Sequence, residues 1–168
     1  MDLADLHDPE RYARVLQVFE AFLAGWEPAV ASALPRWQPW LAGRSRRPFL
    51  QQDLRWLGLA APAAIDPPAL PTAAAAWGSV YVLEGSALGG QVITRSLAGA
   101  GLHPGAGASY FHGWGDATGA MWREFRTLLE AQLRGPRELA EACAAAQATF
   151  DTLSATLEDA LHERTPVA

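Results

Sequence analysis

Residues 71–97 read PTAAAAWGSVYVLEGSALGGQVITRSL, and this stretch decides the fold. It opens with a Pro-Thr pair and four alanines, which are typical of a helix start. Apolar side chains then recur at helical spacing and predict a buried amphipathic helix: Trp77, Val80, Tyr81, Ala87, Leu88, Val92 and Ile93. Gly85, Gly89 and Gly90 conflict with this pattern, because each glycine costs about 1 kcal/mol relative to alanine inside a helix.

Two interpretations of these glycines are open from spacing alone. Glycines allow a bulky or flat partner to approach the helix backbone, or allow the helix to kink. Alternatively, Gly85 and Gly89 lie four residues apart, on one side of the helix, and would allow a second helix to pack closely there. Spacing by itself favours the packing interpretation.

The rest of the chain also predicts helices. Residues 8–26 begin with an Asp-Pro pair suited to a helix start and continue, after a kink near Pro28, towards residue 34. Residues 49–59 and 109–133 form further helical segments, joined by a Pro- and Ala-rich connector and a glycine-rich loop. The last helix, residues 137–162, has this predicted apolar face: Leu139, Ala142, Cys143, Ala146, Phe150, Leu153, Leu157 and Leu161. Because no segment has the pattern of a strand, we expect one all-α, bundle-like domain over residues 1–168.

Composition narrows the class of protein. Half of the 168 residues are apolar, which suits a globular domain with a substantial core. The net charge of −5 argues against a nucleic-acid partner, and no apolar run reaches the ~18 residues typical of a membrane span. The acidic N-terminus is unlike a signal peptide, so we expect a cytoplasmic protein. Cys143 is the single cysteine, expected as a small buried hydrophobic residue, and it excludes an intrachain disulfide.

Charged residues in two places need an interpretation. Arg44, Arg46 and Arg47 follow a Pro- and Trp-rich segment, and we expect a solvated turn there. The alternative is electrostatic attraction of an anionic ligand or an acidic partner. Glu84 lies within the apolar helix, where a structural pair with an arginine such as Arg123 is the favoured interpretation.

The segment YVLEGSALGGQVI, residues 81–93, resembles the distal-helix signature of bacterial heme oxygenases, especially the type that supplies biliverdin to bacteriophytochromes. Residues 2–23, 46–59 and 111–129, and the region around Phe150, are similar to further helices of that family in the same order. The resemblance therefore covers nearly all of the chain.

This resemblance implies a heme-oxygenase-like multi-helix bundle that cleaves heme to biliverdin, iron and carbon monoxide, with oxygen and electrons from a reductase. Heme would be both substrate and cofactor. Gly85, Gly89 and Gly90 would contact heme, and Tyr81 and Gln91 are further candidates for the pocket wall. Implied partners are heme, the reductase and a phytochrome-type sensor, and we also consider a homodimer.

The resemblance departs from the family pattern at the N-terminus. The family holds the heme iron through a proximal histidine on a first helix, and that position falls before Met1. Of the histidines present (His7, His103, His112 and His162), only His7 is considered as a ligand, although its place in a turn suggests an ordinary surface histidine. We therefore assign no catalytic residue and no metal ligand. Either the natural protein carries the histidine upstream, or the chain is a catalytically impaired binding or regulatory module.

Overall fold

The computed structural model describes residues 6–163 and is built of helices. The helices are α1 (Pro9–Ala33), η2 (Pro35–Trp37), α2 (Gln38–Arg44), α3 (Arg47–Trp56), α4 (Ala73–Ala98), α5 (Ser109–His112), η3 (Gly115–Ala117), α6 (Thr118–Gln132) and α7 (Gly135–His162). Within residues 6–163 no β-strand is formed. The predicted all-α fold is confirmed.

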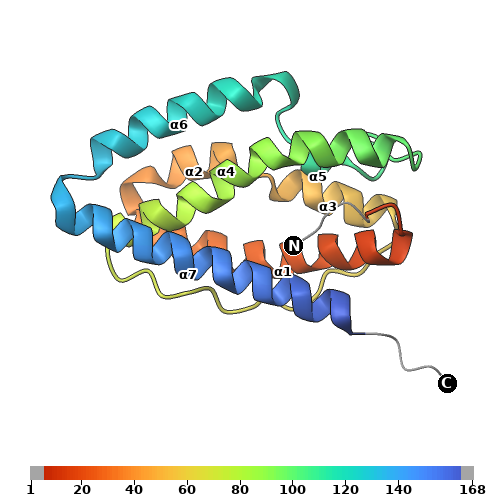
Figure 1. The fold of residues 1–168 in the computed structure, drawn as a ribbon, viewed down its shortest axis with the longest axis horizontal. Coiled ribbons are helices and arrows are strands. Elements are labelled where there is room, and N and C mark those ends of the chain that lie inside the picture. The colour runs from red at the N-terminus through yellow and green to blue at the C-terminus, as the bar shows by residue number, and fades with distance from the viewer. Residues whose placement is uncertain (1–5, 164–168) are drawn as a thin grey trace.

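Helix α4 is the centre of the arrangement (Figure 1). It packs most extensively against α7, and α5, α6 and α1 also contact it. The short α3 packs against α1 and α5. In Figure 1, α6 passes into α7 at the left-hand end, and α4 is seen between these two helices. Helix α4 therefore joins the packing of both halves of the chain.

Side-chain caps mark the starts of helices α1 and α4. The Asp8 side chain accepts a hydrogen bond from the Glu10 amide at 3.0 Å and caps α1, which continues past Pro28. Thr72 caps α4 by accepting from the Ala75 amide at 3.1 Å. These caps satisfy amides that have no partner inside the helix, and both starts agree with the sequence prediction.

A chain of buried hydrogen bonds connects α1, α4 and α7. The Trp26 indole donates to the Ser79 hydroxyl at 2.8 Å, and the Ser79 and Thr149 hydroxyls lie 2.6 Å apart. Thr149 also donates to the Ala145 carbonyl of its own helix at 2.7 Å. The side-chain polar atoms of Trp26, Ser79 and Thr149 are thus all hydrogen-bonded in the core, as is usual for buried polar groups.

The predicted apolar face of α7 is only partly right. Ala142, Leu153 and Leu157 are buried, but Leu139 and Phe150 are exposed. Cys143 is also exposed, which corrects its predicted burial. The stripe of small residues around Ala142 packs against α4, so the neighbouring side chains at a slightly different angle face outward.

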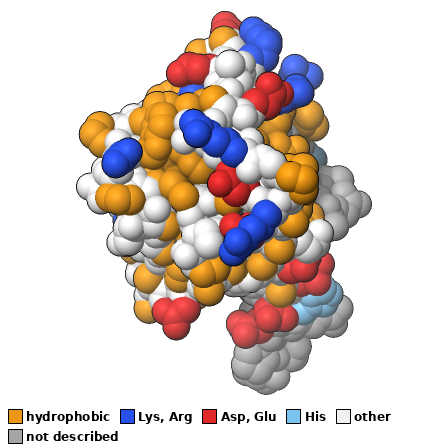
Figure 2. Space-filling view, turned by 90° about the vertical axis from the view of Figure 1, so that its left-hand side faces the viewer, with side chains coloured by type: hydrophobic (Ala, Val, Ile, Leu, Met, Phe, Trp, Pro, Cys, Tyr) orange, Lys and Arg blue, Asp and Glu red, His pale blue; other side chains and the backbone are white. Residues whose placement is uncertain are grey.

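The surface and the helices can be compared with the expectation, drawn from composition, that no segment spans a membrane. Figure 2 views the end at which α6 passes into α7, and hydrophobic side chains there are interspersed with arginine and acidic side chains. Across residues 6–163, no helix carries an apolar stretch of the length and hydropathy needed to cross a bilayer.

Candidate functional site

The outward side of α4 carries the candidate site. Tyr81, Leu88 and Val92 are 45%, 40% and 67% exposed, although their spacing predicted burial. They share one side of the helix with Gly85 and Gly89, because residues three, four and seven positions apart lie together. We call these five residues the glycine face. The helix is apolar nearly all round, so the sequence did not reveal which side meets the core.

The glycines of α4 are of two kinds. A Cβ atom at Gly90 would overlap the backbone carbonyl of Phe111, so Gly90 permits close packing of α5. A Cβ at Gly89 would meet no heavy atom within 4 Å, and at Gly85 only the Trp122 ring, at 3.5 Å. Close helix packing therefore explains Gly90 but does not explain the two glycines of the glycine face.

Trp122 of α6 lies at one edge of the glycine face. Its ring is close to Gly85, and its centroid is 5.4 Å from that of the Tyr81 ring. The sequence places Trp122 within the predicted helical segment 109–133 and gives it no partner. Nothing in its local pattern pointed to α4, since the contact depends on how α6 crosses that helix.

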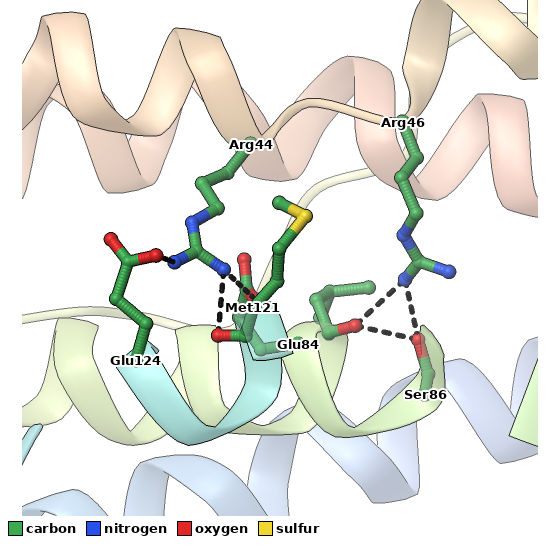
Figure 3. Close-up of polar contacts among 7 residues, drawn as sticks. Arg44, Arg46, Glu84, Ser86, Met121 and Glu124 are labelled. Atoms are coloured by element: carbon green, nitrogen blue, oxygen red, sulfur yellow. Dashed lines mark hydrogen bonds and ion pairs between the residues drawn. The ribbon is translucent and has the colours of Figure 1, made fainter. Parts of the chain in front are cut away.

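Arg46 contacts the backbone and one side chain of α4 (Figure 3). One guanidinium nitrogen donates to the Leu83 carbonyl at 2.7 Å and to the Ser86 hydroxyl at 2.6 Å. Ser86 itself donates to the Leu83 carbonyl of its own helix at 2.7 Å. The guanidinium also lies over the Tyr110 ring, 5.0 Å from its centroid. A buried cation thus holds the backbone of α4 beside Gly85.

Arg44 makes a second set of contacts at the same level of α4. It donates to the Glu84 carboxylate at 3.1 Å, so the arginine partner of Glu84 is Arg44 and not Arg123. The Arg44 side chain is 8% exposed and that of Glu84 is 14% exposed. Burial raises the pKa of the Glu84 carboxyl above its ordinary value, while Arg44 and then Arg46 oppose this rise.

The predicted solvated turn at the arginine cluster is therefore wrong. Arg46 is buried, the Arg44 side chain is largely enclosed, and Arg47 donates to the Glu20 carboxylate at 2.7 Å. Isolated charges are rarely buried, and only the tertiary structure brings carboxylates and carbonyls to these guanidinium groups.

A cavity of about 270 Å³ lies between α1, α2 and α4, on a different side of α4 from the glycine face. Leu23, Trp26 and Val30 contribute its apolar lining, and Glu27 its carboxyl group. The Ser45 hydroxyl donates to Glu27 at 2.7 Å. Burial raises the pKa of Glu27, opposed by the Ser45 hydrogen bond and by the Arg47 charge.

Glu27 should make the stability of the protein depend on pH. Between the ordinary glutamate pKa of about 4.3 and the raised value, the folded state binds more protons than the unfolded state. Stability therefore falls as pH rises through this window. We expect Glu27→Gln to reduce this fall, because glutamine does not titrate and its amide oxygen can still accept from Ser45. Melting temperatures measured from about pH 4.5 to 7 test this, with the exposed Glu130→Gln as control. A variant that is equally pH-dependent would contradict it.

The remaining predicted site residue, Gln91, forms hydrogen bonds away from the glycine face. Its side-chain amide donates to the His112 carbonyl at 3.0 Å and lies 3.4 Å from the Thr118 hydroxyl. Gln91 therefore links α4 to the connection between α5 and α6, and both Gln91 and Gly90 are turned away from the glycine face.

The His7 side chain lies beside the C-terminal part of α4. Its Nε2 atom is 3.3 Å from the Ser96 hydroxyl, two turns beyond Gly89, or about 10 Å along the helix axis. The imidazole is thus displaced from the position opposite the open glycines. His103 lies in the loop after α4, His112 ends α5, and His162 ends α7. Among the described residues, no three His, Cys, Asp or Glu side chains gather as a metal site.

Comparisons with known proteins give the family. No family model matches the chain. The curated "Heme oxygenase" of Xanthomonas campestris pv. campestris (strain 8004) is 42% identical over 149 residues, which cover 85% of this chain and 86% of that protein. The structure is similar to the NO- and CO-bound heme oxygenase of Neisseria meningitidis, with a TM-score of 0.81 and 23% identity, over 98% of this chain and 83% of that one. The second comparison establishes the shared fold, and the first shows that this chain belongs to the heme oxygenase family.

Proposed function

We propose that this protein binds heme on the glycine face of α4 and cleaves it to biliverdin, iron and carbon monoxide. The observation that carries the proposal is the open space at Gly89, where a side chain would meet no protein atom. The resemblance of residues 81–93 to the distal-helix signature, and the 42% identity to a protein named heme oxygenase, support the enzymatic function over the non-catalytic alternative.

The glycine face fits a porphyrin. A flat apolar ring gains most from burying its surface against apolar groups, and a bare glycine backbone allows it to come close. Leu88 and Val92 expose apolar surface beside Gly89, and Tyr81 adds an aromatic ring with a hydroxyl group. Trp122 forms the edge next to Gly85. The same side of α4 therefore lets a porphyrin approach the helix backbone closely and also gives it apolar side chains to contact.

The residues around the glycine face have distinct roles in this proposal. Gly85 and Gly89 give access to the backbone, and Leu88 and Val92 exclude water from one side of the ring. Arg46 and Ser86 keep the backbone at residues 83–86 in place, since both bond to the Leu83 carbonyl. Heme, when bound, supplies the iron that activates oxygen and the macrocycle that is cleaved.

Several partners stay predictions. Cleavage needs electrons, so we propose an electron-donating reductase in the cytoplasm. A phytochrome-type sensor as acceptor of the product and a homodimer rest on the family resemblance alone.

A hemin titration followed by absorption spectroscopy tests the proposal. We expect saturable one-to-one binding, and conversion of the complex to biliverdin on addition of a reductant and oxygen. His7→Ala, compared in the same titration, shows whether this imidazole contributes to the iron spectrum. Absence of saturable binding to the chain would reject the proposed function. Binding without biliverdin would favour the non-catalytic alternative.

A further inference from the structure

The Arg44 guanidinium joins helices α2, α4 and α6 (Figure 3). From the end of α2 it donates to the Glu84 carboxylate of α4 at 3.1 Å. It also donates to the Met121 carbonyl of α6 at 3.0 Å and pairs with the Glu124 carboxylate of α6 at 3.4 Å. The planar guanidinium suits such simultaneous contacts, because its N–H groups point in fixed directions.

These acceptors lie next to the two residues that meet at the edge of the glycine face. Glu84 directly precedes Gly85, and Met121 directly precedes Trp122. Glu124 follows Trp122 by two positions on the same helix. Arg44 therefore connects the backbone that carries Gly85 with the helix that carries the Trp122 ring.

Helix α6 is also held at this end by the Gln91 contact to Thr118 and by the partly buried Trp122. Only Thr118 and Phe125 are buried among its residues. Glycines with positive φ stand before and after it, Gly115 at +57° and Gly135 at +87°. Arg44 provides the polar contacts next to Trp122, one to the part-buried Met121 carbonyl and one to the exposed Glu124 carboxylate.

We propose that Arg44 is a positioning residue for heme bound on the glycine face. It acts by fixing the position of the Trp122 ring beside Gly85. This inference rests on the proposed function, since it concerns the same glycine face. Arg44 does not itself lie on that face. Its effect on a ligand there passes through Trp122.

A matched set of variants tests this role. Arg44→Gln alone would leave the Glu84 carboxylate buried without its partner, which endangers folding. The comparison is therefore between Glu84→Gln, in which Arg44 keeps both bonds to α6, and the double variant Arg44→Gln/Glu84→Gln. We expect the double variant to bind hemin about tenfold more weakly than Glu84→Gln, a coupling of ordinary size for residues in one network.

Two further measurements separate positioning from general destabilisation. In a Trp122→Ala background, adding Arg44→Gln to Glu84→Gln should change the hemin dissociation constant less than about twofold. Without hemin, fluorine NMR of fluorotryptophan-labelled protein should show the Trp122 resonance shifted or broadened when Arg44 is replaced. Trp122→Ala identifies that resonance by its loss.

The outcomes are distinct from those of the proposed function. If the chain without substitutions binds no hemin, the proposed function fails. The Trp122 resonance then still decides whether Arg44 positions the ring. An unchanged resonance would overturn the inference, as would a tenfold loss of affinity that persists without the Trp122 ring.

Discussion

Replacing Gly89 with leucine is expected to weaken hemin binding by about 100-fold, or ~2.7 kcal/mol, while the protein stays folded and at least as stable. No heavy atom lies within 4 Å of a Cβ at Gly89, so the leucine side chain causes no clash in the protein. Helix propensity improves by up to about 1 kcal/mol when glycine is replaced. The same side chain would stand where the porphyrin must approach the backbone. Hemin titration and thermal unfolding of the same samples measure the two effects.

Gly43→Leu is the matched control for this prediction. Gly43 also lies in a helix, α2, and a Cβ there also meets no heavy atom within 4 Å. It is outside the glycine face, so we expect its hemin affinity to equal that of the unchanged protein. Hemin binding by Gly89→Leu at full strength would show that the ligand does not use this face of α4.

Replacing Gly78 with alanine is expected to destabilise the fold by about 3 kcal/mol and to lower the melting temperature by roughly 10 °C. A Cβ at Gly78 would overlap the backbone of Ala142, where α4 packs against α7. Backbone atoms cannot turn aside as a side chain can, so the two helices would have to separate. This separation would also disturb the neighbouring contact between Ser79 and Thr149. Thermal or denaturant unfolding measures the loss.

Gly89→Ala is the control, because it makes the same chemical change in the same helix. At that open position we expect a gain in stability of up to about 1 kcal/mol. Equal stability of the two alanine variants would mean that α4 and α7 are farther apart in solution than in this structure.

Gly78 and Gly89 show what the sequence alone could not predict about the packing of α4. The sequence singled out Gly85, Gly89 and Gly90 because they interrupt an apolar helix, whereas Gly78, between Trp77 and Ser79, was not noticed. Gly78 matters because of Ala142, which is close only after folding. Spacing favoured helix packing for Gly85 and Gly89, but the structure assigns packing to Gly78 and Gly90.

The arginine cluster shows the same limit for charge. Arg44 and Arg46 looked like a solvated turn, since a local sequence offers no partner that would permit burial. Their partners are Glu84, the Leu83 carbonyl and residues of α6, all brought close by folding. Trp122 was missed as a neighbour of Gly85 for the same reason.

By itself, the sequence determined the helical fold, the capped starts of α1 and α4, and the family signature in residues 81–93, whereas the segment 109–133 is divided in the structure into α5, η3 and α6. Those features depend on hydrogen bonds and side-chain spacing within a few residues of one another. Only the tertiary structure decided which side of α4 stays open, which glycines pack, and which arginines are buried. Each of these depends on contacts between segments far apart in the chain, and local periodicity carries no information about which segments meet.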